Sequence, residues 1–285
     1  MTMKIDMNKK LTIVIAGHFV EQFENYLQYL LYSMTDHGLD RCNYVLYYDE
    51  SSCAYENRNK NINKIQKILD KYSIKNHKII LQKGGLLSAF YGMCNNISTK
   101  YVMFLEHDWV FLRKPEYTNI IKAMDNHNFV KCVKFKKLGN IKKQLNAVKD
   151  GMGNEIPLIE DTRIKETSLI QACYWSNNPF ICKIETLRLW SKNFLSNEII
   201  QKIKTNSLNR GSRGIEEIMI KKYTLDIHNR SWESIKDDWG VFLYGPVGME
   251  PIIAHTDGSK RYNGIPESLG QKWIVNYTNV LQRKA

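Results

Sequence analysis

The sequence predicts an α/β fold, in which a mainly parallel central sheet is flanked by helices. Between residues 11 and 108, short apolar runs alternate with longer segments whose apolar residues recur at helical spacing. Such alternation is typical of strand–helix–strand units, whose right-handed crossovers place successive strands parallel. Hydrophobic residues also make up 43% of the 285-residue chain, which suffices for a large core and excludes a disordered protein.

Each strand predicted in this half is a short run of apolar and β-branched residues. The four runs are 11–16, 44–48, 78–81 and 101–105. Between them, apolar side chains recur every three or four residues, which is the period of a helix with one buried face. The three helices cover 20–34, 62–72 and 90–97. Glycines stand at the ends of these elements: Gly17 after the first strand, Gly38 after the first helix, and Gly84 with Gly85 after the third strand.

After Pro115 the pattern changes. A short helix at 120–124 and a strand at 130–135 precede a long polar stretch, residues 136–167, which we expect to act as a lid or binding loop. The elements predicted beyond it are a strand at 169–174, a turn at 177–179, a helix through Leu187 and Trp190, a helix that opens at Gly214, and a strand that ends at His255.

Charge and cysteine usage restrict the class of protein. The net charge is +12, and a basic surface attracts nucleic acids, anionic membranes or phosphorylated substrates. The basic residues are spread along the chain, as on a solvated surface, so contact with a membrane surface remains open. The six cysteines show no paired spacing, which predicts reduced thiols and excludes a disulfide framework. No apolar run approaches 18 residues, and residues 1–10 are polar, so we expect a soluble protein of the cytoplasm with no transmembrane segment.

Polar or glycine residues follow each of the four predicted parallel strands. These groups are 16–18, 49–50, 83–85 and 106–108. Ligands of parallel α/β sheets bind beyond the carboxyl ends of the strands, so we expect the four groups to line one crevice.

The most informative group is Glu106-His107-Asp108, because a fully apolar strand delivers two carboxylates to the crevice. Hard divalent cations prefer oxygen ligands, and a nucleotide diphosphate needs such a cation to neutralise its charge. Asp108 is the better ligand, since its short side chain holds the metal close to the backbone. Glu106 would bind the metal through water or hold the ribose of the nucleotide. The alternative interpretation is a helix cap or an ion pair at a strand end.

This strand and its acidic end resemble the DxD motif of the GT-A fold glycosyltransferases, in particular the family-2-like group. The first acid here is Glu106, so the pattern in this chain is ExD. The resemblance implies a Rossmann-like GT-A fold with a nucleotide-sugar-binding half at 11–115, after a polar tail at 1–10. Residues 116–285 would form the acceptor-binding and catalytic half of the same domain. The implied cofactors are Mn²⁺ or Mg²⁺ and a nucleotide-sugar donor, with a UDP-sugar as first choice and a GDP- or dTDP-sugar as alternatives.

The resemblance also implies roles for the other groups in the crevice. An acid at the position of Asp49 contacts the nucleotide base, although a plain turn acid is the alternative interpretation. The exit of the first strand touches the nucleotide, and the turn after the third strand lies beside the donor. These last two groups are Ala16, Gly17 and His18, and Lys83 and Gly85.

A second acidic pair, Glu216 and Glu217, begins the helix that opens at Gly214. Acids in a first helical turn are favoured by the helix dipole, so a structural role is an open alternative. In the family that this chain resembles, the second acid of such a pair is the catalytic base and the reaction inverts the anomeric carbon. Glu217 matches that position, and Glu216 is the alternative candidate.

Two further groups complete the predicted site, the first of them implied by the resemblance. Many GT-A enzymes use a late histidine as a metal ligand, which implies His255, with Lys260 and Arg261 steadying the diphosphate. Trp175 and Asn177 follow a strand and offer an aromatic face beside an amide, so we expect them on the acceptor side. A structural histidine and solvated basic residues are the alternative interpretations for the first of these groups.

The resulting hypothesis is a metal-dependent glycosyltransferase, which transfers a sugar from a nucleotide-diphosphate donor to a hydroxyl of a glycan, a glycoprotein or another acceptor. A nucleic-acid-binding protein would explain the charge but leaves the converging acids unexplained, so no nucleic-acid partner is expected. A sugar-nucleotide pyrophosphorylase-like nucleotidyltransferase would need a basic, glycine-rich loop after the first strand, and residues 17–20 contain one glycine and no lysine or arginine. A non-catalytic sugar-binding relative is a further alternative.

Overall fold

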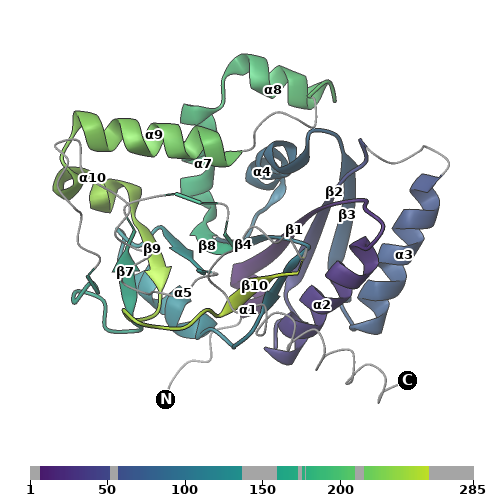
Figure 1. Cartoon of the computed structure of the whole chain (residues 1–285), viewed down its shortest axis with the longest axis horizontal. Coiled ribbons are helices and arrows are strands. Elements are labelled where there is room, and N and C mark those ends of the chain that lie inside the picture. The colour runs from purple at the N-terminus through teal and green to yellow at the C-terminus, as the bar shows by residue number, and fades with distance from the viewer. Residues whose placement is uncertain are drawn as a thin grey trace.

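An eight-stranded sheet forms the centre of the protein (Figure 1). The computed structural model describes residues 7–51, 57–136, 159–172, 175–176, 178–208 and 215–256. The strand order is β3-β2-β1-β4-β8-β6-β9-β7, and a second, two-stranded sheet pairs β10 with β5. The predicted α/β class with a mainly parallel sheet is confirmed.

The first half of the chain forms the four neighbouring parallel strands that the sequence predicts. They are β1 (Leu11–His18), β2 (Asn43–Asp49), β3 (His77–Gln82) and β4 (Tyr101–Glu106). The helices of this half are α1 (Met7–Lys10), α2 (Phe23–Asp36), α3 (Arg58–Lys71) and α4 (Gly85–Asn96). Because the strands are parallel, their carboxyl ends lie at one edge of the sheet.

The second half completes the sheet with mixed pairing. Its strands are β5 (Trp109–Phe111), β6 (Cys132–Lys134), β7 (Leu169–Gln171), β8 (Phe180–Lys183), β9 (Val241–Tyr244) and β10 (Ile253–His255). Its helices are α5 (Tyr117–Asn126), α7 (Ile184–Phe194), α8 (Asn197–Lys204), α9 (Ile215–Asn229) and α10 (Trp232–Trp239). Strand β8 runs antiparallel to both β4 and β6, so β6 has the same direction as β4.

The sequence did not reveal β5, β8, β9, α8 or α10. The three strands have only three or four residues each, too few for a period of two to stand out. Strand β8 continues directly into α7, since Lys183 ends the strand and also precedes the first helical residue. The predicted strand at 169–174 is shorter in the structure and ends at Gln171.

Two hydrophobic cores lie on opposite faces of the sheet. Successive residues of β1 point to opposite faces and so belong to different cores. Ile13 and Ile15 lie in the core beneath α2, α3 and α5. Val14 and Ala16 lie in the core beneath α4, α7, α9 and α10. In Figure 1, α8 and α9 lie along the top, while α2 and α3 lie beside the β3 end of the sheet. None of the helices in the described residues is long and apolar enough to cross a membrane.

Candidate functional site

Several residues of the predicted site meet at the carboxyl edge of the sheet. In the pairing of β1 with β2, His18 stands opposite Asp49, and in the pairing of β1 with β4, Ala16 stands opposite Glu106. The backbone N–H of His107 donates to the carbonyl of Ala16 over 2.9 Å, so the link between these strands continues past the end of β4. The structure therefore places these four predicted donor-side residues along one edge.

Asp49 lies where the N-terminus of α4 approaches the sheet. It is 4% exposed, and its Oδ1 accepts a hydrogen bond from the backbone N–H of Ser51 over 2.8 Å. A Cβ atom added at Gly85 would lie 3.5 Å from Asp49 Oδ2, and Gly85 itself has φ of +57°. The glycine thus gives the turn its left-handed conformation and keeps the carboxylate close to the helix start. The side chain of the preceding Lys83 is exposed.

Gly17 allows two rings to pack against the backbone of β1. A Cβ atom at this position would lie 2.7 Å from His107 Nδ1 and 2.8 Å from Tyr48 Cε1. The His107 Nδ1 atom in turn lies 3.4 Å from the hydroxyl of Tyr48. Burial, with smaller effects from His18 and His255, lowers the pKa of His107 to about 3, so its ring is neutral at physiological pH. A neutral ring adds no positive charge beside the carboxylates. The sequence analysis did not single out His107.

Asp108 and His255 come together through the small sheet. Strand β5 pairs with β10 so that His255 stands opposite Trp109, and the His255 ring packs edge-on against the indole at 4.6 Å. The backbone N–H and hydroxyl of Thr256, 148 positions beyond Asp108, donate to the carbonyl of Asp108 over 2.7 and 2.9 Å. As a result, His255 Nε2 lies 3.4 Å from Asp108 Oδ2. The expected strand that delivers His255 is confirmed.

The chemistry of this pair fits a divalent cation. A carboxylate oxygen and an imidazole nitrogen are both ligands of Mn²⁺, and Mg²⁺ is commonly held by one or two carboxylates together with substrate phosphates and water. Among the described residues there is no cluster of three or more His, Cys, Asp or Glu side chains that could hold an ion. A cation held by Asp108 and His255 would therefore take its other ligands from a diphosphate and water. Glu106 is partly exposed at the end of β4.

The two acids of the second pair occupy the first turn of α9 and differ in their surroundings. The buried side of this helix consists of Ile215, Met219, Tyr223 and Ile227. Glu217 forms an ion pair of 2.9 Å with Lys221, whose side chain is 74% exposed. Glu216 instead interacts electrostatically with Lys134, which is 1% exposed.

Trp175 is buried in the described structure, with 4% of its surface exposed. Its ring packs edge-on against Trp190 at 5.2 Å, and the ammonium of Lys134 lies 4.0 Å from its centroid. The acceptor role of Trp175 stays a prediction. Three predicted site residues, namely Asn177, Lys260 and Arg261, lie outside the described residues, as does most of the predicted lid.

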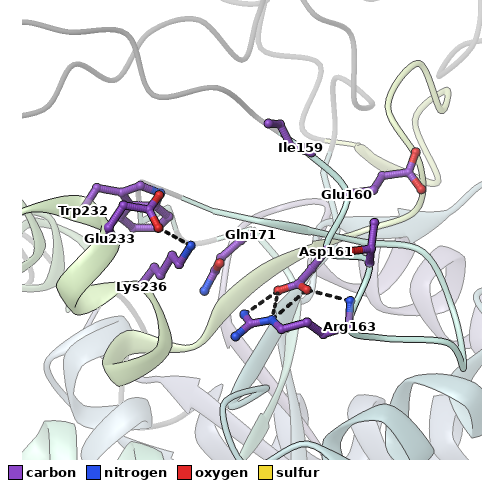
Figure 2. Close-up of a pocket in the computed structure, with 9 residues that line it drawn as sticks. Ile159, Glu160, Asp161, Arg163, Gln171, Trp232, Glu233 and Lys236 are labelled. Atoms are coloured by element: carbon purple, nitrogen blue, oxygen red, sulfur yellow. Dashed lines mark hydrogen bonds and ion pairs between the residues drawn. The ribbon is translucent and has the colours of Figure 1, made fainter.

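A separate pocket of about 320 Å³ lies beside β7 and α10 and contains none of the predicted site residues (Figure 2). Its polar groups pair with one another. Arg163 bonds to Asp161 and to Asp237 through both oxygens of each carboxylate, and Lys236 pairs with Glu233. Since these charged side chains are already paired with one another, we assign the pocket no role in the chemistry of the crevice.

Comparisons with known proteins concern the fold. No family model and no curated protein matches this sequence. Solved structures do match. The galactosyltransferase LgtC, in complex with donor and acceptor sugar analogues, is 10% identical, and the match covers 93% of this chain and 95% of LgtC with a TM-score of 0.46. Mouse xyloside xylosyltransferase 1 is also 10% identical. The match covers 87% of this chain and 97% of the xylosyltransferase, with a TM-score of 0.40.

The mannosyltransferase PcManGT from Pyrobaculum calidifontis, solved with GDP-Man and Mn²⁺, is 10% identical, with a TM-score of 0.44. This match covers 63% of the present chain and 46% of PcManGT, so the chain spans less than half of that protein. This chain is similar in fold to glycosyltransferases of the GT-A type. Identities this low, with TM-scores below 0.5, bear on fold alone.

Proposed function

We propose that this protein is a metal-dependent glycosyltransferase, which moves a sugar from a nucleotide-diphosphate donor to an acceptor hydroxyl. The observation that carries the proposal is the approach of His255 Nε2 to within 3.4 Å of Asp108 Oδ2. This pair lies at the carboxyl edge of a parallel sheet, which is where such folds bind nucleotides. Strand pairing aligns His18, Asp49 and Glu106 along the same edge.

The donor would lie along this edge. Asp108 and His255 are the residues that would hold Mn²⁺ or Mg²⁺, whose chemistry is to neutralise the charge that develops on the departing diphosphate. Glu106 would bind this ion through water or hold the ribose of the donor. Asp49 would accept hydrogen bonds from the base, and residues 16–18 would contact the nucleoside. Lys83 and Gly85, before and at the start of α4, would face the donor, with Lys260 and Arg261 assigned to the diphosphate.

The acceptor hydroxyl needs a base that takes its proton as the oxygen attacks the anomeric carbon. The family resemblance implies Glu217, with Glu216 as the alternative. We favour Glu216, because Glu217 pairs with an exposed lysine, whereas the charge of Glu216 raises the pKa of the buried Lys134. One displacement of this kind inverts the anomeric centre. A UDP-sugar is our first choice of donor, before GDP- and dTDP-sugars, and the acceptor class is a glycan or glycoprotein beside Trp175 and Asn177.

A thermal-shift screen tests the proposal. UDP-, GDP- and dTDP-sugars are each added with Mn²⁺ and with chelator, because a ligand that binds only the native state raises the melting temperature. We expect one nucleotide class to raise it in the presence of Mn²⁺ alone. Absence of a shift with every donor, together with a shift on adding an oligonucleotide, would favour the nucleic-acid-binding alternative.

Asp108→Asn sharpens this test, since the amide keeps the shape of the side chain and removes its negative charge. We expect the variant to remain folded and to lose the Mn²⁺-dependent shift and the release of nucleotide diphosphate from the donor. Asp70→Asn, on the exposed side of α3, is the matched control and should behave as the wild type. Full donor turnover by Asp108→Asn would disprove the metal assignment.

A further inference from the structure

The pocket beside β7 and α10 lies at the outer edge of the large sheet, away from the crevice (Figure 2). Strand β7 ends the strand order, and β8, β6 and β9 separate it from β4. At about 5 Å between neighbouring strands, β7 and β4 are about 20 Å apart across the sheet. The pocket volume of about 320 Å³ is within the range that small-molecule sites occupy. The pocket is therefore large enough for a ligand of its own.

The walls of this pocket are held in place by the protein itself. Arg163 Nη1 and Nη2 bond to the two carboxylate oxygens of Asp237 over 2.7 and 2.8 Å, and Arg163 Nε donates to Asp161 Oδ1 over 2.9 Å. The Cζ atom of the guanidinium lies 3.9 Å from the centroid of the Phe129 ring. Gln171 Nε2 donates to Asp237 Oδ1 over 3.1 Å. Because these side chains are already ordered, a ligand would lose little binding free energy in ordering them.

The charged side chains of the lining have partners within the protein, which argues against a charged ligand. Lys236 pairs with Glu233. Glu160 accepts hydrogen bonds from the hydroxyl of Ser168 over 2.9 Å and from the backbone N–H of Val247 over 3.2 Å. A phosphate is best bound by an unpaired cation, and a basic peptide by an unpaired carboxylate. The lining therefore favours an uncharged ligand.

The hydrogen-bonding capacity that remains suits a ligand with several hydroxyl groups. In the contacts among the described residues, Gln171 uses only its amide nitrogen and Glu233 only one carboxylate oxygen, so each keeps an oxygen that can accept from a hydroxyl. The hydroxyl of Thr162 and the apolar side chains of Trp232 and Ile159 also line the pocket. A sugar ring presents hydroxyls at its rim and C–H groups on its faces. It therefore matches a lining that sets hydroxyl acceptors beside apolar side chains.

We infer that this pocket binds an uncharged sugar unit of the acceptor glycan, at a distance from the crevice in which transfer occurs. The inference rests on the proposed function and names the acceptor more closely, as a neutral glycan of several units, because one sugar cannot span about 20 Å between β4 and β7. The pocket contributes binding and takes no part in the chemical step. It should therefore lower the KM for the glycan and leave kcat unchanged.

Thr162→Trp tests the pocket by filling it. Thr162 is exposed and lines the pocket, so the larger side chain takes the space of the sugar without disturbing the core. Thr118→Trp, at an exposed threonine of α5 outside the lining, is the matched control. Wild type and variants are applied to an array of neutral di- to hexasaccharides of hexoses and N-acetylhexosamines. Their melting temperatures verify that each is folded.

Glu233→Gln is a second variant, which replaces a carboxylate of the lining by an amide of the same shape. We expect it to bind the glycan about 3- to 10-fold more weakly, which corresponds to the weakening of one hydrogen bond. Glu198→Gln is its control, because Glu198 is an exposed helical acid that pairs with Lys202 in the way that Glu233 pairs with Lys236.

The glycan that the wild type binds is then tested as an acceptor, by following release of nucleotide diphosphate with Mn²⁺ and the donor found in the thermal-shift screen. In this reaction a glycan hydroxyl oxygen bonds to the anomeric carbon, the bond to the diphosphate oxygen breaks, and the hydroxyl proton passes to the catalytic base. We expect Thr162→Trp to lose binding on the array and to raise the KM for the glycan at least about 10-fold. Its kcat and its donor binding should stay unchanged, and Thr118→Trp should behave as the wild type.

The outcomes separate the two proposals. A wild type that binds no nucleotide sugar refutes the proposed function, whatever the array shows. A wild type that binds donor but no neutral glycan refutes the pocket assignment, as does glycan binding that survives in both Thr162→Trp and Glu233→Gln. If Thr162→Trp does not fold, Glu233→Gln against Glu198→Gln decides the same question. A glycan that is bound in the pocket but never consumed overturns the acceptor role.

Discussion

At the scale of single residues, the packing at the crevice depends on a glycine whose missing side chain lets aromatic rings contact the backbone. Gly17 is the clearest example, since His107 and Tyr48 occupy the space that a side chain would need at this position. His107 directly follows the acidic end of β4, and Tyr48 belongs to β2. A change at Gly17 should therefore affect the donor side of the crevice as well as the fold.

Gly17→Ala tests this. We expect it to lower the free energy of unfolding by about 1–3 kcal/mol, as overpacking does, and to weaken donor binding because the rings must shift. The measurement is chemical denaturation together with the thermal-shift assay for the donor. Gly38→Ala is the control, because its φ is +79° while nothing lies within 4 Å of an added Cβ, so it carries backbone strain without a clash. If both variants bound donor equally well, the packing argument would fail.

At the scale of elements, the packing of α9 gives its two first-turn acids different surroundings. The helix buries the side that contains Met219 and Tyr223, and its first turn carries two acids whose surroundings differ. Spacing alone could not choose between Glu216 and Glu217, because both lie in the first turn of the helix. Their partners come from other elements, and those partners depend on how α9 packs.

Two amide variants separate the acids. We expect Glu216→Gln to slow donor turnover by at least about 100-fold, the usual size of a general-base contribution, and Glu217→Gln to slow it much less. Donor binding should persist in both, since neither acid is assigned to the nucleotide. Glu198→Gln is the control, because Glu198 is an exposed helical acid that pairs with Lys202 as Glu217 pairs with Lys221. If Glu217→Gln lost more donor turnover than Glu216→Gln, the catalytic base would be assigned to Glu217 instead.

At the scale of the whole molecule, the buried side chain of Lys134 makes the stability of the protein depend on pH. In the unfolded chain Lys134 has its ordinary pKa of 10.5, and in the folded protein this value falls to about 7. Between these values the unfolded state binds more protons, so the free energy of unfolding rises with pH.

We therefore expect the wild type to gain stability from about pH 7 to about pH 8.5, with a slope of up to about 1.4 kcal/mol per pH unit. The upper limit keeps the measurement below the range in which the cysteines of the unfolded chain ionise. Urea denaturation at several pH values measures the slope. Lys134→Met should flatten it and raise stability near pH 7, because the variant buries no charge. An unchanged slope in Lys134→Met would show that this lysine keeps its ordinary pKa.

The sequence by itself determined the first half of the fold and the edge of the sheet at which several candidate site residues lie. Alternating strand and helix periods are local properties, and they predicted β1 to β4, the helices between them, and the acidic end of β4. The lack of paired spacing among the cysteines predicted reduced thiols, and the four cysteines within the described residues are free and buried. The very short strands β5, β8 and β9 were not predicted, because three or four residues are too few to show the alternation of a strand.

Only the tertiary structure decided which distant residues meet. The contact of Asp108 with His255 depends on the pairing of β5 with β10, and the contact of Lys134 with Trp175 depends on mixed pairing around β8. A lysine at the end of a strand gives no sign in the sequence that it is buried. The physical reason is that periodicity reports which face of an element is apolar, whereas the partners of a polar side chain are set by pairing and packing across the whole chain.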